Sequence, residues 1–386
     1  MTPALPQELA ARHVGASRPP AARSRTDRDI SVEVDSLTPD AWDRLIGEFD
    51  DIALDQTAVR AEDEWGPARA SHFVLRRNGV AVAGARVAIR KLPGWRRGLA
   101  YTRFGPFWRR RGSCDPDLYG AAVSALVQEY GVRRGHCVTV LPRPNPVHYA
   151  RECAVLAEHG FVPRRPLRDA NRYLEDLSLA EDAQLRSLDQ KWRYNLRQAL
   201  RNGIEVRLCD DGLAAYMELH AAMVSRKRFH DGGPLHLVPA LSARLPEGMR
   251  PQVILALHGG RPVFGAVIAV LGDTAYYLFG ASADEALQLK AGYALHWWVL
   301  RRLAESGARW YDLGTDVCDA GLRQFKKGLV GKAGAVVVMD SEYDRCTNLP
   351  SRLATDAIYG IRDLKRAVRT WRDRRGNRGT GQQAPS

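Results

Sequence analysis

The same hairpin pattern occurs twice in the sequence, and this internal repeat constrains the fold more than any other feature. Segment 78–89, Asn-Gly-Val-Ala-Val-Ala-Gly-Ala-Arg-Val-Ala-Ile, aligns with segment 259–270, Gly-Gly-Arg-Pro-Val-Phe-Gly-Ala-Val-Ile-Ala-Val. The offset is constant at 181 residues, which is the separation of Gly79 from Gly260. Asn-Gly and Gly-Gly between apolar runs are typical of type I′ hairpin turns. The sequence therefore predicts one hairpin-containing domain that is present in two copies.

The segments after the two hairpins correspond as well. Each hairpin is followed by a strand that ends in Phe-Gly, then by a helix and another strand, at 99–105, 116–131 and 136–141 in the first copy and at 274–280, 285–307 and 309–313 in the second. This alternation predicts an α/β (α+β) fold of two tandem domains, each a mixed, mostly antiparallel sheet flanked by helices. Gly84 and Gly265 lie at equivalent strand positions, where they indicate a bulge or a close approach of another part of the chain.

With 386 residues, the chain is long enough for two domains. We expect them at 30–165 and 166–372, with a C-terminal helix as the last element of the second domain. Residues 1–29 and 373–386 are rich in Arg, Gly, Pro or Gln and lack apolar periodicity, so they are predicted to be disordered tails.

The cellular location and the absence of a bound metal are predicted from motifs that the sequence does not contain. The longest apolar stretch, 263–271, is shorter than the roughly 20 residues that a membrane-spanning helix needs. The first residues contain no apolar segment of a signal peptide. The six cysteines show no metal-binding spacing, and we expect them to be reduced thiols of a cytoplasmic protein without a metal site.

The chain carries 57 Lys and Arg against 44 Asp and Glu, a net charge of +13. An excess of this size attracts polyanions, namely nucleic acid, phosphorylated small molecules or an anionic membrane face. One candidate contact is a stripe of Arg193, Arg197 and Arg201 on a helix, which is either a face that contacts nucleic acid or phosphate or a solvated one.

A second basic stripe lies on the closing helix, where Arg362, Arg366 and Arg369 stand opposite an apolar stripe. Packing of the apolar stripe, with the arginines in solvent, is the simpler interpretation there.

Common catalytic signatures are absent: the sequence contains no G-x-x-x-x-G-K-[ST], G-x-G-x-x-G, H-E-x-x-H or G-x-S-x-G. The segment that most suggests chemistry is Arg-Trp-Tyr-Asp-Leu-Gly at 309–314, followed by Gly-Leu-Arg-Gln-Phe-Lys-Lys-Gly at 321–328. A strand that ends in Tyr311 and Asp312 delivers polar groups to a sheet edge, where α/β proteins commonly bind ligands.

These segments and several others stand in the order of the motifs of the Fem family, and the chain resembles that family over about residues 35 to 370. The other segments are Asp-Gln-Thr at 55–57, Tyr-Thr-Arg-Phe-Gly-Pro-Phe at 101–107, Trp-Arg-Tyr-Asn-Leu-Arg-Gln-Ala-Leu-Arg-Asn-Gly-Ile-Glu-Val at 192–206 and Tyr-Tyr-Leu-Phe-Gly-Ala-Ser at 276–282. FemA/FemB/FemX-type aminoacyltransferases move amino acids from aminoacyl-tRNA onto peptidoglycan precursors. They are built from two acetyltransferase-like (GNAT) domains, in agreement with the repeat.

The resemblance implies that Phe325 and Lys326 lie in the active site. Lys326 would offer its cation to the oxyanion of the reaction or to a substrate phosphate. Lys327, which carries the same charge, has no counterpart in the family pattern and provides a control.

Three other residues are candidates with two interpretations each. Asp312 would accept a proton or orient the acceptor amine, or it would cap the turn before Gly314. Tyr277 and Tyr311 would line the acceptor cleft or belong to the core.

The chain departs from the family pattern at several places, among them the lack of an Arg just before Tyr277, where the family has a phosphate contact. Glu62, Asp63 and Glu64 stand where the family has a Lys that contacts a phosphate of its nucleotide-linked precursor. Trp108 and Arg109 replace an acidic residue, and Arg109 becomes a candidate substrate contact. The acceptor is therefore expected to be either a peptidoglycan precursor or another amine, such as a natural product.

The leading expectation is an aminoacyltransferase that needs no bound cofactor and uses aminoacyl-tRNA as co-substrate. An acyl-CoA- or acetyl-CoA-dependent N-acyltransferase is the first alternative; residues 292–294 fit half of its pyrophosphate loop, but Leu289 replaces the expected Gln or Arg. A non-catalytic nucleic-acid-binding protein is the second. A loose contact with the cytoplasmic membrane face is compatible with the charge.

Overall fold

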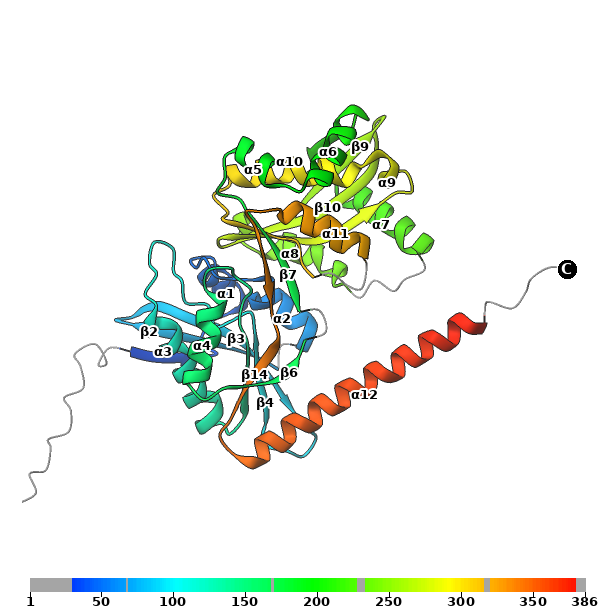
Figure 1. Ribbon diagram of the computed structural model, residues 1–386. Coiled ribbons are helices and arrows are strands. Elements are labelled where there is room, and N and C mark those ends of the chain that lie inside the picture. The colour runs from blue at the N-terminus through cyan, green and yellow to red at the C-terminus, as the bar shows by residue number, and fades with distance from the viewer. Residues whose placement is uncertain (1–29, 67–68, 168–169, 228–232, 316–319, 380–386) are drawn as a thin grey trace, which may run out of the picture.

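The structure is a computed structural model that describes residues 30–66, 69–167, 170–227, 233–315 and 320–379. Two seven-stranded mixed sheets, each flanked by helices, form two α/β domains, as the repeat predicted (Figure 1). The expected tail at 1–29 lies outside the described residues.

The first sheet has the strand order β1-β2-β3-β4-β5-β14-β6. Its strands are β1 (Ile30–Val34), β2 (Ala70–Arg77), β3 (Val80–Lys91), β4 (Gly98–Arg103), β5 (Cys137–Leu141), β14 (Ser341–Cys346) and β6 (Val162–Pro166). The helices of this domain are α1 (Pro39–Ile46), α2 (Ala58–Trp65), α3 (Asp117–Leu126), α4 (Tyr149–Glu158) and α12 (Leu349–Gly379). Because side chains alternate along a strand, Phe73 and Leu75 pack with α3 and α4, whereas Val74 belongs to the cluster around α1.

The second sheet has the order β13-β7-β12-β11-β10-β9-β8. Its strands are β13 (Ala335–Val338), β7 (Asn171–Asp176), β12 (Trp310–Asp312), β11 (Thr274–Ser282), β10 (Arg261–Leu271), β9 (Gln252–His258) and β8 (Glu205–Leu208). Its helices are α5 (Glu181–Ser187), α6 (Gln190–Arg201), α7 (Leu213–Lys227), α8 (Val238–Arg244), α9 (Ala286–Leu289), α10 (Ala291–Glu305) and α11 (Ala320–Val330). The cluster formed by α6, α10 and α11 is distinct from the one that holds α7.

The predicted repeat is confirmed in the pairing of the strands. Hairpin β2–β3 corresponds to β9–β10, and each sheet contains a parallel pair at the same place, β4 with β5 and β11 with β12. The turn residues Asn78 and Gly79 have φ values of 53° and 76°, as a type I′ turn requires. A Cβ at Gly84 would lie 2.5 Å from Phe107 Cζ, and one at Gly265 would lie 2.9 Å from Tyr216 Cδ2. Both glycines therefore allow the close approach that the sequence indicated.

The C-terminal part of the chain corrects the expected domain division. Strand β6 pairs with β14 in the first sheet, and β7 pairs with β13 in the second, so the chain crosses between the sheets twice. Helix α12 therefore packs on β3, β4, β5 and β14 of the first sheet and does not close the second domain (Figure 1). It also continues to Gly379, so residues 373–379 are helical and only 380–386 of the predicted tail lie outside the described residues.

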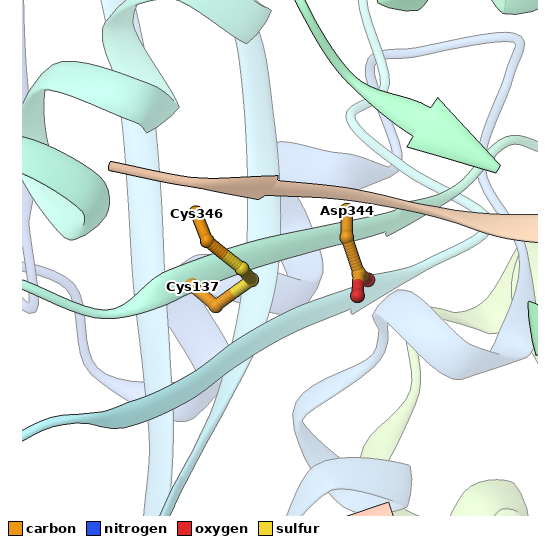
Figure 2. Close-up of side chains that lie close together, drawn as sticks. All are labelled: Cys137, Asp344 and Cys346. Atoms are coloured by element: carbon orange, nitrogen blue, oxygen red, sulfur yellow. A yellow bond between two sulfur atoms is a disulfide. The ribbon is translucent and has the colours of Figure 1, made fainter. Parts of the chain in front are cut away.

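A disulfide corrects the expectation that all six cysteines are reduced. Cys137 of β5 and Cys346 of β14 are bonded to each other (Figure 2). They are direct partners in the antiparallel register, a pairing that their separation of 209 residues conceals in the sequence. The neighbouring carboxylate of Asp344 accepts a hydrogen bond from Thr139 Oγ1 at 2.6 Å and pairs with Arg165.

No helix among the described residues is long and apolar enough to cross a membrane.

The two domains share an apolar core and a buried ion-pair cluster. Asp273, in the turn between β10 and β11, accepts from Arg109 Nη2 at 2.7 Å and from Arg143 Nη1 at 2.9 Å, both in the first domain. Tyr276 Oη donates to the carbonyl of Ile52 at 3.0 Å. Burial raises the pKa of the Asp273 carboxyl, but the charges of the two arginines outweigh it and lower the pKa from 3.8 to about 2.

Replacing Asp273 by Asn should lower the free energy of unfolding by about 3–5 kcal/mol, because two largely buried guanidinium groups lose their counter-charge. Because the folded-state pKa is depressed, the wild-type contribution is present above about pH 4 and is lost as the pH falls toward 2. Denaturant titrations of both proteins at neutral pH measure the difference.

The control is Glu181→Gln, which breaks an ion pair with Arg301 in which both side chains are more than half exposed. We expect a loss below about 1 kcal/mol for it. Equal losses in the two variants would contradict the structural importance of Asp273.

Candidate functional site

A cleft of about 1070 Å³ opens in the second domain, between α6, α10, α11 and the strands β10 and β11. A second cavity among the described residues, beside α5 and α10, measures only about 190 Å³. The side chains used below are those of Trp192 and Asn195 on α6, Tyr277 on β11, Tyr293 and His296 on α10, and Phe325 and Lys326 on α11.

Aromatic rings form one wall of the cleft. The ring of Phe325 lies 5.9 Å from Trp192, 5.0 Å from Tyr293 and 5.3 Å from His296, measured between ring centroids. Tyr277 lies 4.9 Å from His296 on the strand side. Residues three apart on a helix share a face, so Trp192 and Asn195 of α6 lie on one side of their helix, and Tyr293 and His296 of α10 lie on one side of theirs.

Lys326 brings a cation into this aromatic environment. Its side chain lies in the cleft wall, the residue is only 5% exposed, and Nζ donates to the carbonyl of Thr315 at 2.6 Å. The carbonyl belongs to the turn that follows β12, where a Cβ at Gly314 would lie 3.8 Å from Nζ. The ammonium group is therefore held by the end of β12, next to the cleft.

His296 lies in the same wall and is neutral at neutral pH. Burial, with a further contribution from the charge of Lys326, lowers the pKa of the imidazole from 6.5 to about 3. Its Nδ1 lies 3.1 Å from Tyr311 Oη. A group with so low a pKa is a poor proton acceptor, and the imidazole contributes shape and a hydrogen bond instead.

The N-terminus of α10 also borders the cleft. Lys290 adopts a left-handed conformation with φ 58° immediately before the helix, and Lys290 and Gly292 both line the cavity. Amides in the first turn of a helix lack intrahelical acceptors and favour anions, phosphate in particular. This end of the cleft can therefore bind a phosphate group of a substrate.

The carboxylate of Asp312 is engaged away from the cleft. Asp312 is 1% exposed, accepts from Arg172 Nε at 3.2 Å through Oδ2, and accepts from the amide of Gly314 at 2.8 Å through Oδ1. It does not line the cavity. Of the two interpretations from the sequence, the turn cap is the one that this geometry supports.

Of the other residues predicted to contact substrate, some line the cleft and others are engaged in structural contacts. Tyr277 and Phe325 line the cleft, whereas Tyr311 is fully buried and contributes to the core behind His296. Arg109 lies in the first domain and is bound to Asp273, so its predicted contact with substrate is replaced by a contact between domains.

The arginine stripe on α6 is not uniform. Arg193 donates through Nη1 to the carbonyls of Arg186 at 3.1 Å and Leu188 at 2.5 Å. Arg197 and Arg201 are exposed on the same helix that supplies Trp192 to the cleft. Two of the three predicted residues are thus exposed to solvent, on the side of α6 that faces away from Trp192.

Sequence reasoning missed His296, Tyr293 and Trp192 as cleft residues. The only signal for this region was the half-matched phosphate loop at 292–294, which does coincide with the N-terminus of α10.

Comparisons with known proteins give the fold of the domain that contains the cleft. Residues 186–327, which contain most of the cleft, match the family model "Acetyltransferase (GNAT) domain". The crystal structure of FemX superposes with a TM-score of 0.65 at 18% identity, over 82% of this chain and 98% of that one. A conserved protein of unknown function from Bacteroides thetaiotaomicron VPI-5482 superposes with a TM-score of 0.52 at 13% identity, over 82% of this chain and 100% of that one. No curated protein sequence matches.

At these identities the superpositions show the fold. The fold is that of two tandem GNAT-like domains, and the match of residues 186–327 to the acetyltransferase model supports an acyltransferase.

The different environments of Asp312 and Lys326 predict effects of different size on stability. Asp312→Asn should lower the free energy of unfolding by about 3 kcal/mol, because the largely buried guanidinium of Arg172 loses its counter-charge. Lys326→Met removes the hydrogen bond to the carbonyl of Thr315 but also the cost of keeping a cation buried, so the loss should be smaller, about 1.5 kcal/mol or less. Thermal and denaturant unfolding measure both; the reverse order would contradict the assignment of Asp312 to structure and Lys326 to the site.

Proposed function

We propose that this FemABX-like acyltransferase moves an amino acid from aminoacyl-tRNA to the amine of a second substrate and so forms an amide bond. The acceptor is a peptidoglycan precursor or a related amine such as a natural product. The observation that supports this most is the buried ammonium of Lys326, in the wall of a cleft that also contains aromatic rings and the N-terminus of α10.

The reaction needs few groups from the protein. The neutral amine of the acceptor attacks the ester carbonyl, a C–N bond forms, and the carbonyl oxygen takes up negative charge. Lys326 stabilises this oxyanion because its ammonium is already desolvated and fixed beside the cleft. The C–O bond to the ribose then breaks, and the departing ribose oxygen takes the proton from the amine nitrogen.

Proton transfer between the substrates themselves is plausible because the titratable side chains of the cleft are poorly suited to act as a base. Asp189 accepts from the amide of Lys191 at 2.8 Å as the cap of α6, and Asp284 pairs with Arg226. The low pKa of His296 makes it a poor base. Among the described residues that line the cleft, these groups are therefore poor candidates for a dedicated base.

The remaining features of the site would bind the aminoacyl-tRNA. The partly exposed rings of Tyr293 and Phe325, which pack on the buried Trp192, offer a surface on which the terminal adenine can stack. The start of α10 would bind the adjacent phosphate. Arg197 and Arg201 would extend the positive surface toward the rest of the tRNA.

An acyl-CoA-dependent N-acyltransferase is the second candidate. The N-terminus of α10 supports it, since a helix start with Gly292 also suits a pyrophosphate. Against it, Leu289 provides no hydrogen-bond donor from its side chain at the preceding loop position. Acyl-CoA as the co-substrate would also leave Arg197 and Arg201 without a role. A non-catalytic nucleic-acid-binding protein is the third candidate, and it would give no role to the buried Lys326.

Transfer from pooled tRNA charged with labelled amino acids tests the proposal, with the purified chain and a small-molecule extract of the source cells as the acceptor pool. We expect label in a base-stable, RNase-resistant product of low mass. Lys326→Met should reduce the rate by about 10²-fold or more, the effect of losing an oxyanion contact.

Lys327→Met is the matched control and should change the rate little, since Lys327 follows on the same helix without the contact to Thr315. Equal losses in the two variants would contradict the role of Lys326. A parallel reaction with labelled acetyl-CoA that alone yields product would favour the second candidate.

The three arginines of α6 are expected to contribute differently to tRNA binding. Arg197→Ala combined with Arg201→Ala should weaken tRNA binding and reduce the slope of log K against log salt by about 1–2, because fewer counterions are released. Arg193→Ala should leave the slope unchanged, because its guanidinium is bound to backbone carbonyls. Filter binding at several salt concentrations measures the slopes, and an unchanged slope in the double variant would make the stripe a solvated face.

A further inference from the structure

Only the first part of α12 is fixed to the first domain by the contacts described. Ser351, Ala354, Thr355 and Tyr359 are buried against that domain, and Tyr359 Oη donates to Glu342 Oε2 at 2.8 Å. Beyond this part the helix runs away from both domains (Figure 1). At about 1.5 Å per residue, Ile361–Gly379 adds roughly 28 Å of helix.

An apolar stripe on α12 is exposed along the whole length over which exposure is described. Leu349, Leu353, Ile361, Leu364 and Val368 are between 43% and 66% exposed. Their separations of four, eight, three and four residues place them on one side of the helix. This side differs from the one that carries the buried residues 351, 354, 355 and 359. The apolar stripe predicted from the sequence therefore does not pack on the protein in its second half.

The same half of the helix is strongly basic. Residues 361–379 contain eight Lys and Arg against two Asp, a net charge of +6. Arg362 and Lys365 follow the apolar positions 361 and 364 by one residue, about 100° around the helix. The segment is thus a helix with an apolar side and an excess of cations, the composition of helices that lie in a membrane interface.

Charge and exposed apolar area together select among the partners that could cover this surface. A second copy of the chain would bring two segments of charge +6 together, which is unfavourable. RNA would satisfy the cations but would leave Leu364 and Val368 in water. An anionic lipid surface takes both, because the headgroups attract Lys and Arg while the acyl boundary accepts apolar side chains.

We propose that the projecting half of α12 docks the protein on an anionic lipid bilayer, with Ile361, Leu364 and Val368 inserted at the acyl boundary. This inference does not depend on the reaction or on the donor. It gives a role to a feature that neither the cleft nor the packing of the domains uses.

Co-sedimentation of the full chain with vesicles tests the proposal without an activity assay. We expect binding to vesicles of phosphatidylcholine mixed with phosphatidylglycerol, weakening as salt is raised, and little binding to phosphatidylcholine alone. Leu364→Glu combined with Val368→Glu should lower the partition coefficient about tenfold or more, since the apolar contribution is lost. Lys365→Gln combined with Arg372→Gln should lower it for the anionic vesicles.

Val132→Glu is the matched control, because Val132 is 58% exposed on the first domain and should leave binding unchanged. Circular dichroism checks that every variant is folded. Unchanged vesicle binding in the Leu364 and Val368 variant would overturn the proposal, as would equal binding to neutral and anionic vesicles. So would an α12-dependent dimer, or α12-dependent tRNA binding, in a protein that does not bind vesicles.

Discussion

The buried ion pair between Arg172 of β7 and Asp312 of β12 is the contact on which the candidate site depends. It joins two antiparallel strands at the point where β12 ends, and the second oxygen of Asp312 binds the amide of Gly314. The turn fixed in this way presents the carbonyl of Thr315, which holds the ammonium of Lys326. A charge that lies far from the substrate thus decides where the cation in the cleft is held.

Strand exchange between the domains makes this arrangement possible. Strand β7 follows directly after β6 of the first sheet, and β13 leads directly into β14, so the second sheet is completed by segments whose neighbours belong to the first. Asp273 and its two arginines join the domains at another place. The geometry of the cleft therefore depends on the pairing of both sheets, and a second domain cut out at 166–372 would take β14, a strand of the first sheet, with it.

Local features were predictable from the sequence, and long-range pairings were not. The Asn78-Gly79 turn and the glycines at 84 and 265 are read from neighbouring residues, because backbone conformation and close approach are local requirements. The pairing of Cys137 with Cys346, the return of α12 to the first sheet and the partner of Asp312 each depend on a register between distant strands. A single sequence does not contain that register.

The basic composition illustrates the same limit. The net charge of +13 predicted an anionic partner, but the structure divides the cations into several groups. Arg109, Arg143 and Arg172 are engaged by buried carboxylates, whereas Arg197, Arg201 and the projecting part of α12 are open to solvent or to a partner. Only burial and hydrogen bonding separate the cations that stabilise the fold from those that can contact a substrate or a surface.

The most direct test of the central claim measures which donor the cleft binds. A stable analogue of the tRNA end, an adenosine that carries its amino acid through an amide, would be titrated calorimetrically into the wild-type chain and into Lys326→Met, with coenzyme A titrated in parallel. The account predicts saturable binding of the analogue to both proteins and competition by intact aminoacyl-tRNA, because Lys326 acts on the oxyanion and not on the bound donor. Binding of coenzyme A alone, or of neither ligand, would contradict it.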